Sequence, residues 1–359
     1  MNAVLAGASV PRAAIRRDVA LVLFGTGKVG GAFLQLLRTP VGENLRLLGA
    51  ANSRHQQTQP MALAERRLRE RLDAGGEPRD DAALLRVLHA STAQVRVIID
   101  ATASAELAQR HPEWLAHGCH VVTANKALAG GELAGWCALR GACAQGVQYG
   151  DSATVGAGLP ALATLRRLHA CGDKPTRIEG VFSGSLSYLF NHYDGRQPLS
   201  TLLREACALG YTEPDPRADL SGEDVVRKLL ILARAAGFPL DRADVEVENL
   251  VPEALRDVAQ AEFLERLDEL DAAIAARHAA AVSRDCVLRY LARFEADGSA
   301  RVGLVQVAAS HPAAHLRGAD NLFAFTTSRY QHGPLVIQGA GAGPEVTAQA
   351  LLGDVLALT

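Results

Sequence analysis

The 359-residue sequence has little of several features, and each shortage excludes a class of protein. Its 37 basic and 39 acidic side chains nearly balance, at a formal net charge of −2, so nothing favours binding to nucleic acid or to a charged membrane surface. No apolar run reaches the roughly 18 residues that a membrane-spanning helix needs. The six cysteines are scattered without a CxxC pair, which argues against a disulfide scaffold. We expect reduced thiols and a cytoplasmic location.

The N-terminal half alternates strand and helix patterns. Residues 1–17 lack a strong apolar segment, so we interpret them as a short flexible leader rather than a secretory signal. The next run, 18–24, is nearly all apolar, which is typical of a strand buried on both faces of a parallel sheet. Further strands are predicted at 45–51, 95–100 and 120–123, and helices at 33–37, 59–90 (with a break at 75–78) and 105–117. This alternation predicts an α/β fold, a Rossmann-type doubly wound parallel sheet over 18–150.

The pattern changes beyond residue 150, where strands and helices mix. Strands are predicted at 177–183, 287–294, 302–309 and 335–338, and helices at 200–209, 222–236 and, with breaks, 252–280. This order predicts an α+β second domain over 151–335. The last segment, 336–359, has a glycine-rich loop and then a helical pattern, and we expect it to return to the first domain.

The first strand runs into a glycine motif with the spacing GxGxxG. It comprises Gly25, Thr26, Gly27, Lys28, Val29 and Gly30. The first glycine permits a tight turn, the second lets a pyrophosphate approach the backbone, and the third lets helix and strand pack closely. The motif alone is also compatible with a turn that binds nothing. Its place between a strand and a helix favours a dinucleotide site.

The second strand ends at Asn52, Ser53 and Arg54. A site selective for NAD usually carries an acid here to bind the ribose 2′-hydroxyl, and this sequence has none. Ser53 and Arg54 can instead contact a 2′-phosphate, so we expect NADPH to be used at least as well as NADH. The alternative is that Arg54 is simply solvated.

Polar side chains follow the next two predicted strands. Thr102 and Ser104 come after the strand that ends at Asp100, and Lys126 follows the strand that ends at Thr123. Ligands of doubly wound sheets bind at the carboxyl ends of the strands, so Thr102 and Lys126 are candidates for the site. An ordinary surface lysine is the alternative for Lys126.

The segment from Leu209 to Lys228 is the richest in chemical groups. Its prolines hold a short loop rigid around Glu213 and Asp215, and the helix that follows places Asp224 and Lys228 on one face. A surface i,i+4 ion pair would explain Asp224 and Lys228 alone. The acids clustered ahead of Lys228 favour a site for an amino-bearing small molecule, with the lysine exchanging a proton with an alcohol or carbonyl oxygen. Nearby carboxylates favour the charged lysine, so alcohol oxidation should prefer higher pH.

Several long motifs occur in one order from about Val19 to the C-terminus. They are GTGKVG at 25–30, TANK at 123–126, TVGAGLP at 154–160, SGSLSY at 183–188, GYTEPDPR at 210–217, DLSG at 219–222, RK at 227–228 and GAGAG at 339–343. Through these motifs the sequence resembles the homoserine dehydrogenase family, most closely the dehydrogenase portion of bacterial bifunctional aspartokinase–homoserine dehydrogenases.

This resemblance implies the interconversion of L-aspartate 4-semialdehyde and L-homoserine with NADPH or NADH, in threonine, methionine and isoleucine biosynthesis. It implies that Lys228 is the proton donor and acceptor and that Lys126 assists at the substrate oxygen and the nicotinamide. It assigns the substrate pocket to Gly184, Ser185, Tyr211, Glu213, Asp219 and Asp224, with Glu213 and Asp219 nearest the amino group. It assigns cofactor contacts to Thr102 and Gly343, and a sodium ion to the main-chain carbonyls of Ser152, Val155, Ala157 and Leu159.

The resemblance also implies a homodimer formed through the second domain, which would then be the catalytic and dimerisation domain. We expect neither an aspartokinase ahead of Val19 nor a regulatory ACT domain after the catalytic region, and therefore one activity with little feedback by threonine. Two alternatives stay open. One is a dehydrogenase of another small amino acid or semialdehyde, and the other is a catalytically silent dinucleotide-binding protein.

Overall fold

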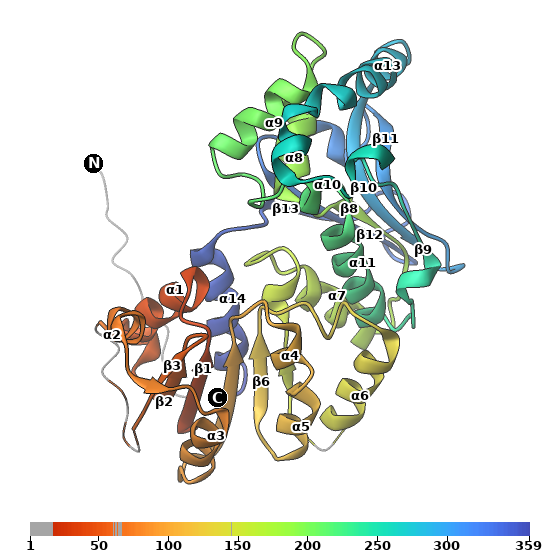
Figure 1. Ribbon diagram of the computed structural model, residues 1–359. Helices are drawn as coiled ribbons and strands as arrows, with labels where there is room; N and C mark the ends of the chain where they lie inside the picture. Colours follow the sequence, from red (N-terminus) through yellow and green to blue (C-terminus); the bar gives the residue numbers. More distant parts are fainter. Residues whose placement is uncertain (1–16, 60, 62, 64–66, 145) are drawn as a thin grey trace, which may run out of the picture.

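The computed structural model describes residues 17–359 except 60, 62, 64–66 and 145. The expected leader therefore lies outside the described residues, apart from Arg17. The described chain forms two sheets, each with its own helices, and Figure 1 shows them as a lower and an upper domain. No helix within the described ranges is both long and apolar enough to cross a bilayer.

The first sheet has the strand order β4-β3-β2-β1-β5-β6-β7. Its parallel part consists of β2 (Leu45–Ala51), β1 (Val19–Phe24), β5 (Val95–Asp100), β6 (His120–Thr123) and β7 (Tyr149–Gly150). Every residue of β1 is buried, as expected for a central strand covered on both faces. This confirms the Rossmann-type fold.

Two helical predictions for this domain hold only in part. The helical stretch expected over 59–90 contains α2 (Leu68–Ala74) and α3 (Asp81–His89), which lie on either side of the break expected at 75–78, but the antiparallel edge of β3 (His55–Thr58) and β4 (Glu77–Pro78) beside β2 was not predicted. The helix expected over 105–117 is divided into α4 (Ala105–Ala108) and α5 (His111–Ala116). Pro112 lies in the first turn of α5, where its missing N–H is tolerated, whereas it would break a continuous helix.

The second sheet has the order β13-β12-β8-β10-β11-β9. Its strands are β8 (Pro175–Val181), β9 (Val245–Val247), β10 (Cys286–Glu295), β11 (Ala300–Ala308), β12 (Asp320–Thr327) and β13 (Leu335–Ala340). β12 was not predicted, although it is an almost fully buried strand between β13 and β8. The second domain was expected to end at residue 335, but β13 belongs to its sheet and continues to Ala340.

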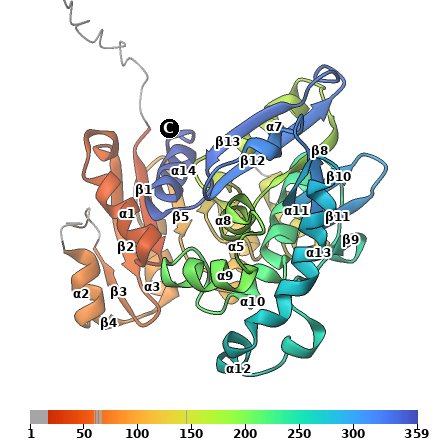
Figure 2. The same ribbon diagram turned by 90° about the horizontal axis from the view of Figure 1, so that it is seen from above.

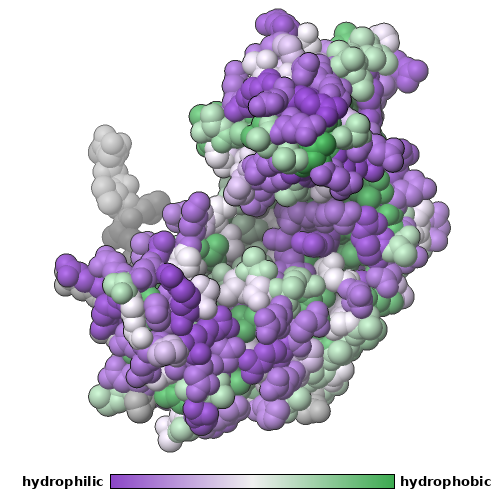
Figure 3. All heavy atoms as spheres, viewed as in Figure 1, coloured by the Kyte–Doolittle hydropathy of each residue, from purple (hydrophilic) through white to green (hydrophobic). Residues whose placement is uncertain are grey.

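The helices of the second domain are α7 (Ala161–Ala170), α8 (Gly184–His192), α9 (Leu199–Ala208), α10 (Arg217–Leu220), α11 (Glu223–Ala235), α12 (Gln260–Glu265) and α13 (Asp271–Val282). The first domain adds α1 (Lys28–Leu37) and α6 (Leu133–Cys143). The last helix, α14 (Pro344–Leu356), packs against α1, although it follows the second sheet in the chain (Figure 2). The surface is hollowed between the two domains, and residues of intermediate or hydrophobic character, white to green in Figure 3, lie there among hydrophilic ones.

Candidate active site

The loop after β1 has the conformation that a dinucleotide fingerprint requires. Gly25 has a φ of 91°, in the left-handed region, and its N–H donates to the carbonyl of Ala51 at 2.8 Å. A side chain at Gly30 would overlap the carbonyl oxygen of Gly25, so the turn and α1 pack at the limit that backbone atoms allow. A Cβ at Gly27 would meet nothing within 4 Å. The N-terminus of α1 is thus open to a ligand, and its unpaired N–H groups favour an anion.

The side chains of the motif differ in exposure. Thr26 is buried, Val29 is half-buried and Lys28 is exposed. Lys28 is the first residue of α1, so its ammonium group can approach a negatively charged ligand at the helix N-terminus. These features fit the pyrophosphate of a dinucleotide.

Of the three candidate residues in the turn after β2, one is held by hydrogen bonds within the protein and two are exposed. The side-chain oxygen of Asn52 accepts the N–H groups of Arg54 and His55 at 2.8 and 2.7 Å, and its amide donates to the carbonyl of Leu72 at 2.9 Å. Asn52 therefore shapes the turn and has little hydrogen-bonding capacity left for a cofactor. Ser53 and Arg54 are exposed. They are the two side chains of this turn that remain available to a 2′-phosphate.

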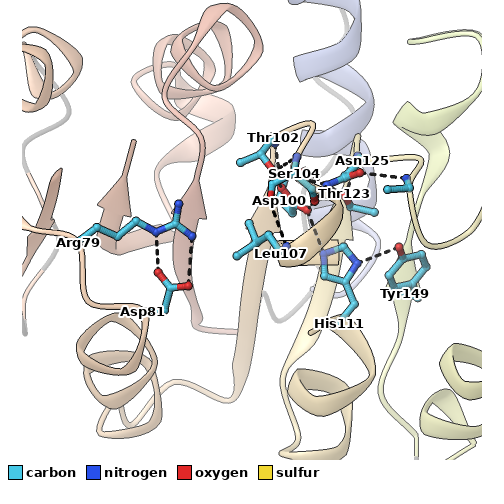
Figure 4. Close-up of polar contacts among 11 residues, drawn as sticks. Arg79, Asp81, Asp100, Thr102, Ser104, Leu107, His111, Thr123, Asn125 and Tyr149 are labelled. Atoms are coloured by element: carbon cyan, nitrogen blue, oxygen red, sulfur yellow. Dashed lines mark hydrogen bonds and ion pairs between the residues drawn. The ribbon is translucent and has the colours of Figure 1, made fainter. Parts of the chain in front are cut away.

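A fully buried carboxylate, Asp100, ties together the loops that follow β5 and β6 (Figure 4). One of its oxygens accepts the N–H and the hydroxyl of Thr102, at 2.9 and 2.6 Å. The other contacts Nε2 of His111 at 3.0 Å and the amide of Asn125 at 2.9 Å. The other ring nitrogen of His111 contacts the hydroxyl of Tyr149 at 3.1 Å. Asp100 thereby fixes Thr102 on one side and the residue before Lys126 on the other.

Asn125 holds the loop in which Lys126 lies. Its amide also donates to the carbonyl of Ser104 at 2.8 Å, and its oxygen accepts the N–H of Ala127 at 3.0 Å. Asn125 is 3% exposed, whereas Lys126 beside it is only partly buried. The buried amide holds the loop, and the lysine next to it faces the second domain.

Asp224 lies between the two lysines and joins the domains. Lys228 Nζ donates to Asp224 Oδ2 at 2.7 Å, and Lys126 Nζ lies 3.6 Å from Asp224 Oδ1. Lys228 Nζ also donates to the carbonyl of Phe182 at 2.7 Å, and its side chain is 12% exposed. Two of the three ammonium N–H groups of Lys228 are thus occupied, which leaves one for a ligand.

The electrostatics of this group have a clear direction. Burial acts to raise the pKa of Asp224, but Lys228 and Lys126 outweigh it and hold the pKa well below its usual range. Burial lowers the pKa of Lys126, and the charges of Lys228 and Arg227 act the same way, while Asp224 opposes them. Asp224 is therefore a permanent anion between two amines, and Lys126 loses its proton more easily than an ordinary lysine.

A second polar group lies on the loop before α11. Ser185 donates to Asp219 Oδ1 at 2.6 Å, and the N–H of Glu213 donates to Asp219 Oδ2 at 2.8 Å. Burial raises the pKa of Asp219, an effect that these hydrogen bonds partly offset. The side chain of Glu213 is exposed. Asp219 is thus positioned by its neighbours, whereas the Glu213 carboxylate is open to solvent.

The acid cluster expected ahead of Lys228 is divided, and only part of it faces the site. Asp215 forms a 2.6 Å ion pair with Arg217, and Glu223 forms a 2.5 Å ion pair with Arg242. Because both carboxylates are neutralised locally, they are not available to an amino group. This leaves the three predicted substrate acids, Glu213, Asp219 and Asp224.

The remaining predicted pocket residues lie at the start of α8 and beside it. Gly184 is the first residue of α8, and Ser183 caps that helix by accepting the N–H of Leu186. Tyr211 is 46% exposed and stacks on Tyr188 with ring centroids 4.4 Å apart. Tyr211 can therefore form a wall, since its ring is supported from one side.

The predicted cation loop is tightly turned. Gly156 and Ala157 have φ values of 74° and 52°, so two successive residues are left-handed. Ser152 is bound to α14, since its N–H and hydroxyl donate to Asp354 at 2.9 and 2.7 Å. Asp151, next to it, is fully buried, and one of its oxygens has no hydrogen-bond partner among the described residues. The other oxygen of Asp151 forms an ion pair with Arg166 at 2.5 Å, so this carboxylate already has a cation beside it.

The sequence did not reveal three contributors to the site. The Phe182 carbonyl, Asn125 and the Asp100–His111 pair act through main-chain or buried groups. Asn125 lies within a quoted motif, and its proximity to Lys126 was the available signal. The other contacts join residues at least 11 positions apart, and only the fold reveals them.

Comparisons with known proteins identify the family of the chain. Residues 160–356 match the family described as homoserine dehydrogenase, and residues 25–147 match the family described as homoserine dehydrogenase, NAD binding domain. The chain is 38% identical over 360 residues to a homoserine dehydrogenase of Emericella nidulans, covering 94% of this chain and 97% of that protein. It is 40% identical over 356 residues to the chloroplastic bifunctional aspartokinase/homoserine dehydrogenase 2 of Zea mays. That match covers 96% of this chain and 39% of the relative, so the chain spans about two fifths of the bifunctional protein.

Solved structures share the whole architecture. A Candida auris protein described as of unknown function has a TM-score of 0.88 and 34% identity, covering 96% of this chain and 98% of that one. A hyperthermophilic archaeal homoserine dehydrogenase in complex with NADPH has a TM-score of 0.70 and 21% identity, covering 94% and 96%. The second likeness shows the fold alone.

Proposed function

Because the chain belongs to the homoserine dehydrogenase family, we propose that it is an NAD(P)H-dependent oxidoreductase that interconverts L-aspartate 4-semialdehyde and L-homoserine. The observation that carries this proposal is the Lys228–Asp224–Lys126 group, in which one amine from each domain meets a shared carboxylate. A carbonyl that is reduced to an alcohol needs a proton at its oxygen, and these amines supply one.

The cofactor would be held by the fingerprint turn, the N-terminus of α1 and Thr102, and when bound it supplies or accepts the hydride. Gly343, which precedes α14 beside α1, is the further proposed contact. Exposed Ser53 and Arg54 support the use of NADPH, with NADH as the second cofactor.

The lysines would take different parts. Lys228 is the proposed proton donor and acceptor, because Asp224 and the Phe182 carbonyl fix its amine and leave one N–H for the substrate oxygen. Lys126 would assist at the same oxygen from the nucleotide-binding side. Asp224 orients both lysines and stabilises their charged forms, which suits the reduction direction.

The amino group of the substrate would bind to carboxylates. Asp219 is held in place by Ser185 and by the Glu213 N–H, and Glu213 adds an exposed carboxylate beside it. Gly184 and Tyr211 would complete the pocket walls. A substrate ammonium group would offset the cost of burying Asp219.

Further proposals rest on family membership. A monovalent cation, sodium, would be bound by the main-chain carbonyls of Ser152, Val155, Ala157 and Leu159. The protein would act as a homodimer in the cytoplasm, in the pathway to threonine, methionine and isoleucine, with residues 151–335 as its catalytic and dimerisation region.

A steady-state assay of homoserine oxidation with NADP⁺ and with NAD⁺ tests the proposal. We expect homoserine to be oxidised with a far higher kcat/KM than serine or the homologue with one more methylene. Equal efficiency with those alcohols would indicate a dehydrogenase of another small amino acid. No turnover with any of them would indicate a silent nucleotide-binding protein.

A further inference from the structure

A cavity of about 540 Å³ lies where α6 of the first domain meets α7 and α11 of the second. In Figure 1 these three helices lie side by side at the right of the molecule. The volume is within the roughly 300–1,000 Å³ typical of small-molecule sites. None of the lysines or acids assigned to the active site lines this cavity.

The walls of the cavity are basic and apolar. Arg140, Arg166, Arg234 and His169 line it, together with Trp136 and other apolar residues. Among the residues that the structure describes, no carboxylate lines it. An anion would therefore be attracted, whereas the ammonium group of an α-amino acid would lack a partner.

Arg234 shows most directly that an acceptor is missing. Its side chain is 0% exposed, and it donates to the carbonyls of Leu240 and Ala129 at 3.0 and 2.8 Å. Its second terminal nitrogen is buried and makes no hydrogen bond within the described part of the chain, and the Asp241 carboxylate lies 3.7 Å away. The Asp241 ion pair offsets part of this charge, but the N–H itself has no acceptor, and a small shift of the side chain toward an anion in the cavity would supply one.

Two more groups favour an organic anion over a simple ion. Arg140 is exposed, and its guanidinium lies 5.7 Å from the ring centroid of Trp136, so a cation and an aromatic surface are adjacent. Phe238 adds a second aromatic wall. Arg166, by contrast, is already paired with the buried Asp151 at 2.5 Å and is a weaker candidate for contact.

We propose that this cavity binds a small organic anion, with a phosphate or carboxylate group against Arg234 and Arg140 and an apolar portion against Trp136 and Phe238. The site is separate from the fingerprint and from the lysine pair. It lies at the junction of the domains, since Arg234 also donates to Ala129, three residues after Lys126.

Tryptophan fluorescence tests the proposal directly. The chain has two tryptophans, and Trp136 lines the cavity, while Trp114 is 1% exposed and stacks on Phe24. Phenyl phosphate is the probe, phenol is its neutral match and inorganic phosphate is the anion alone. We expect saturable quenching by phenyl phosphate, at least about tenfold weaker binding of phenol, and no response in Trp136→Phe.

A charge reversal separates this site from general electrostatics. Arg140→Glu should weaken phenyl phosphate binding about tenfold, because it replaces an attraction by a repulsion. Arg167→Glu is the matched control, since Arg167 is exposed on α7 and does not line the cavity. This variant should bind phenyl phosphate as tightly as the unaltered protein does. Saturating NADP⁺ should leave the titration unchanged.

Four results would overturn the proposal. Equal binding of phenol and phenyl phosphate would indicate an apolar pocket only. An equal loss of affinity for phenyl phosphate in Arg140→Glu and Arg167→Glu would indicate that the overall charge of the protein, rather than this cavity, attracts the anion. Loss of quenching with NADP⁺ would place the phosphate at the fingerprint. The absence of any saturable response would mean that the cavity binds no such anion.

Discussion

Asp224→Asn removes the negative charge between the two lysines and keeps the shape of the side chain. The carboxylate oxygens lie 2.7 Å from Lys228 Nζ and 3.6 Å from Lys126 Nζ. The Asp224 side chain is 44% exposed, so a water-like dielectric is the appropriate one. Two unit charges about 3 Å apart then interact by about 1.4 kcal/mol, which corresponds to about one pH unit.

The sign of this effect follows from the loss of an anion. Without Asp224, Lys126 loses the interaction that acts to raise its pKa, so its proton leaves at lower pH. We expect the rise of kcat/KM for homoserine oxidation to move about one pH unit lower in Asp224→Asn. The fall of kcat/KM for semialdehyde reduction should move in the same direction, because reduction needs the protonated amine.

The assay is a profile of kcat/KM for homoserine oxidation between about pH 6 and 10. Asp215→Asn is the matched control, since Asp215 is on the preceding loop but is paired with Arg217, and its profile should keep the original midpoint. A midpoint that stays in place in Asp224→Asn, or moves to higher pH, would refute the reasoning that Asp224 stabilises the charged form of Lys126.

Three further substitutions, one of them paired with a control, test the nucleotide-binding domain. Gly30→Ala would overlap the carbonyl oxygen of the first fingerprint glycine, so we expect a loss of about 1–3 kcal/mol of unfolding free energy and weaker NADPH binding. Gly31→Ala, whose Cβ meets only the flexible Arg69 side chain, should be tolerated in the same denaturation and titration experiments, and equal damage by both would contradict this packing. Arg54→Ala should lower the preference for NADPH over NADH about tenfold, and an unchanged ratio of the two kcat/KM values would remove the phosphate role. Asp100→Asn replaces a carboxylate oxygen that accepts hydrogen bonds by an NH2 group that cannot accept them. Urea denaturation should therefore show a loss of about 3 kcal/mol of unfolding free energy, and a variant of unaltered stability would show that the network contributes little.

The sequence predicts the first domain well where local patterns are strong. The strands at 45–51, 95–100 and 120–123 coincide with β2, β5 and β6, because each is a short apolar run that ends at polar or small residues. The edge strand β3 was missed, since His55–Thr58 is polar and is held by backbone pairing with β2 rather than by burial. β12 was missed despite its apolar Leu322–Phe325 core, a signal that was present in the sequence.

The structure brings Lys228, Asp224 and Lys126 together, but the sequence predicted only one of their two pairings. The spacing of Asp224 and Lys228 correctly placed them on one helical face, and their ion pair is confirmed. The contact of Asp224 with Lys126 joins residues of different domains, and no local pattern encodes it. Glu223 lies in the acid cluster ahead of Lys228 but is paired with Arg242, 19 positions further along the chain, and no local pattern predicts that contact.

The most direct test of the account compares homoserine oxidation by the unaltered protein and by Lys228→Ala, with NADPH binding measured separately by fluorescence. The account predicts at least about a hundredfold loss of kcat/KM, because a positioned acid–base group contributes roughly that much, while the NADPH dissociation constant changes less than about twofold. Turnover that survives the substitution would contradict the assignment of Lys228 as the proton carrier.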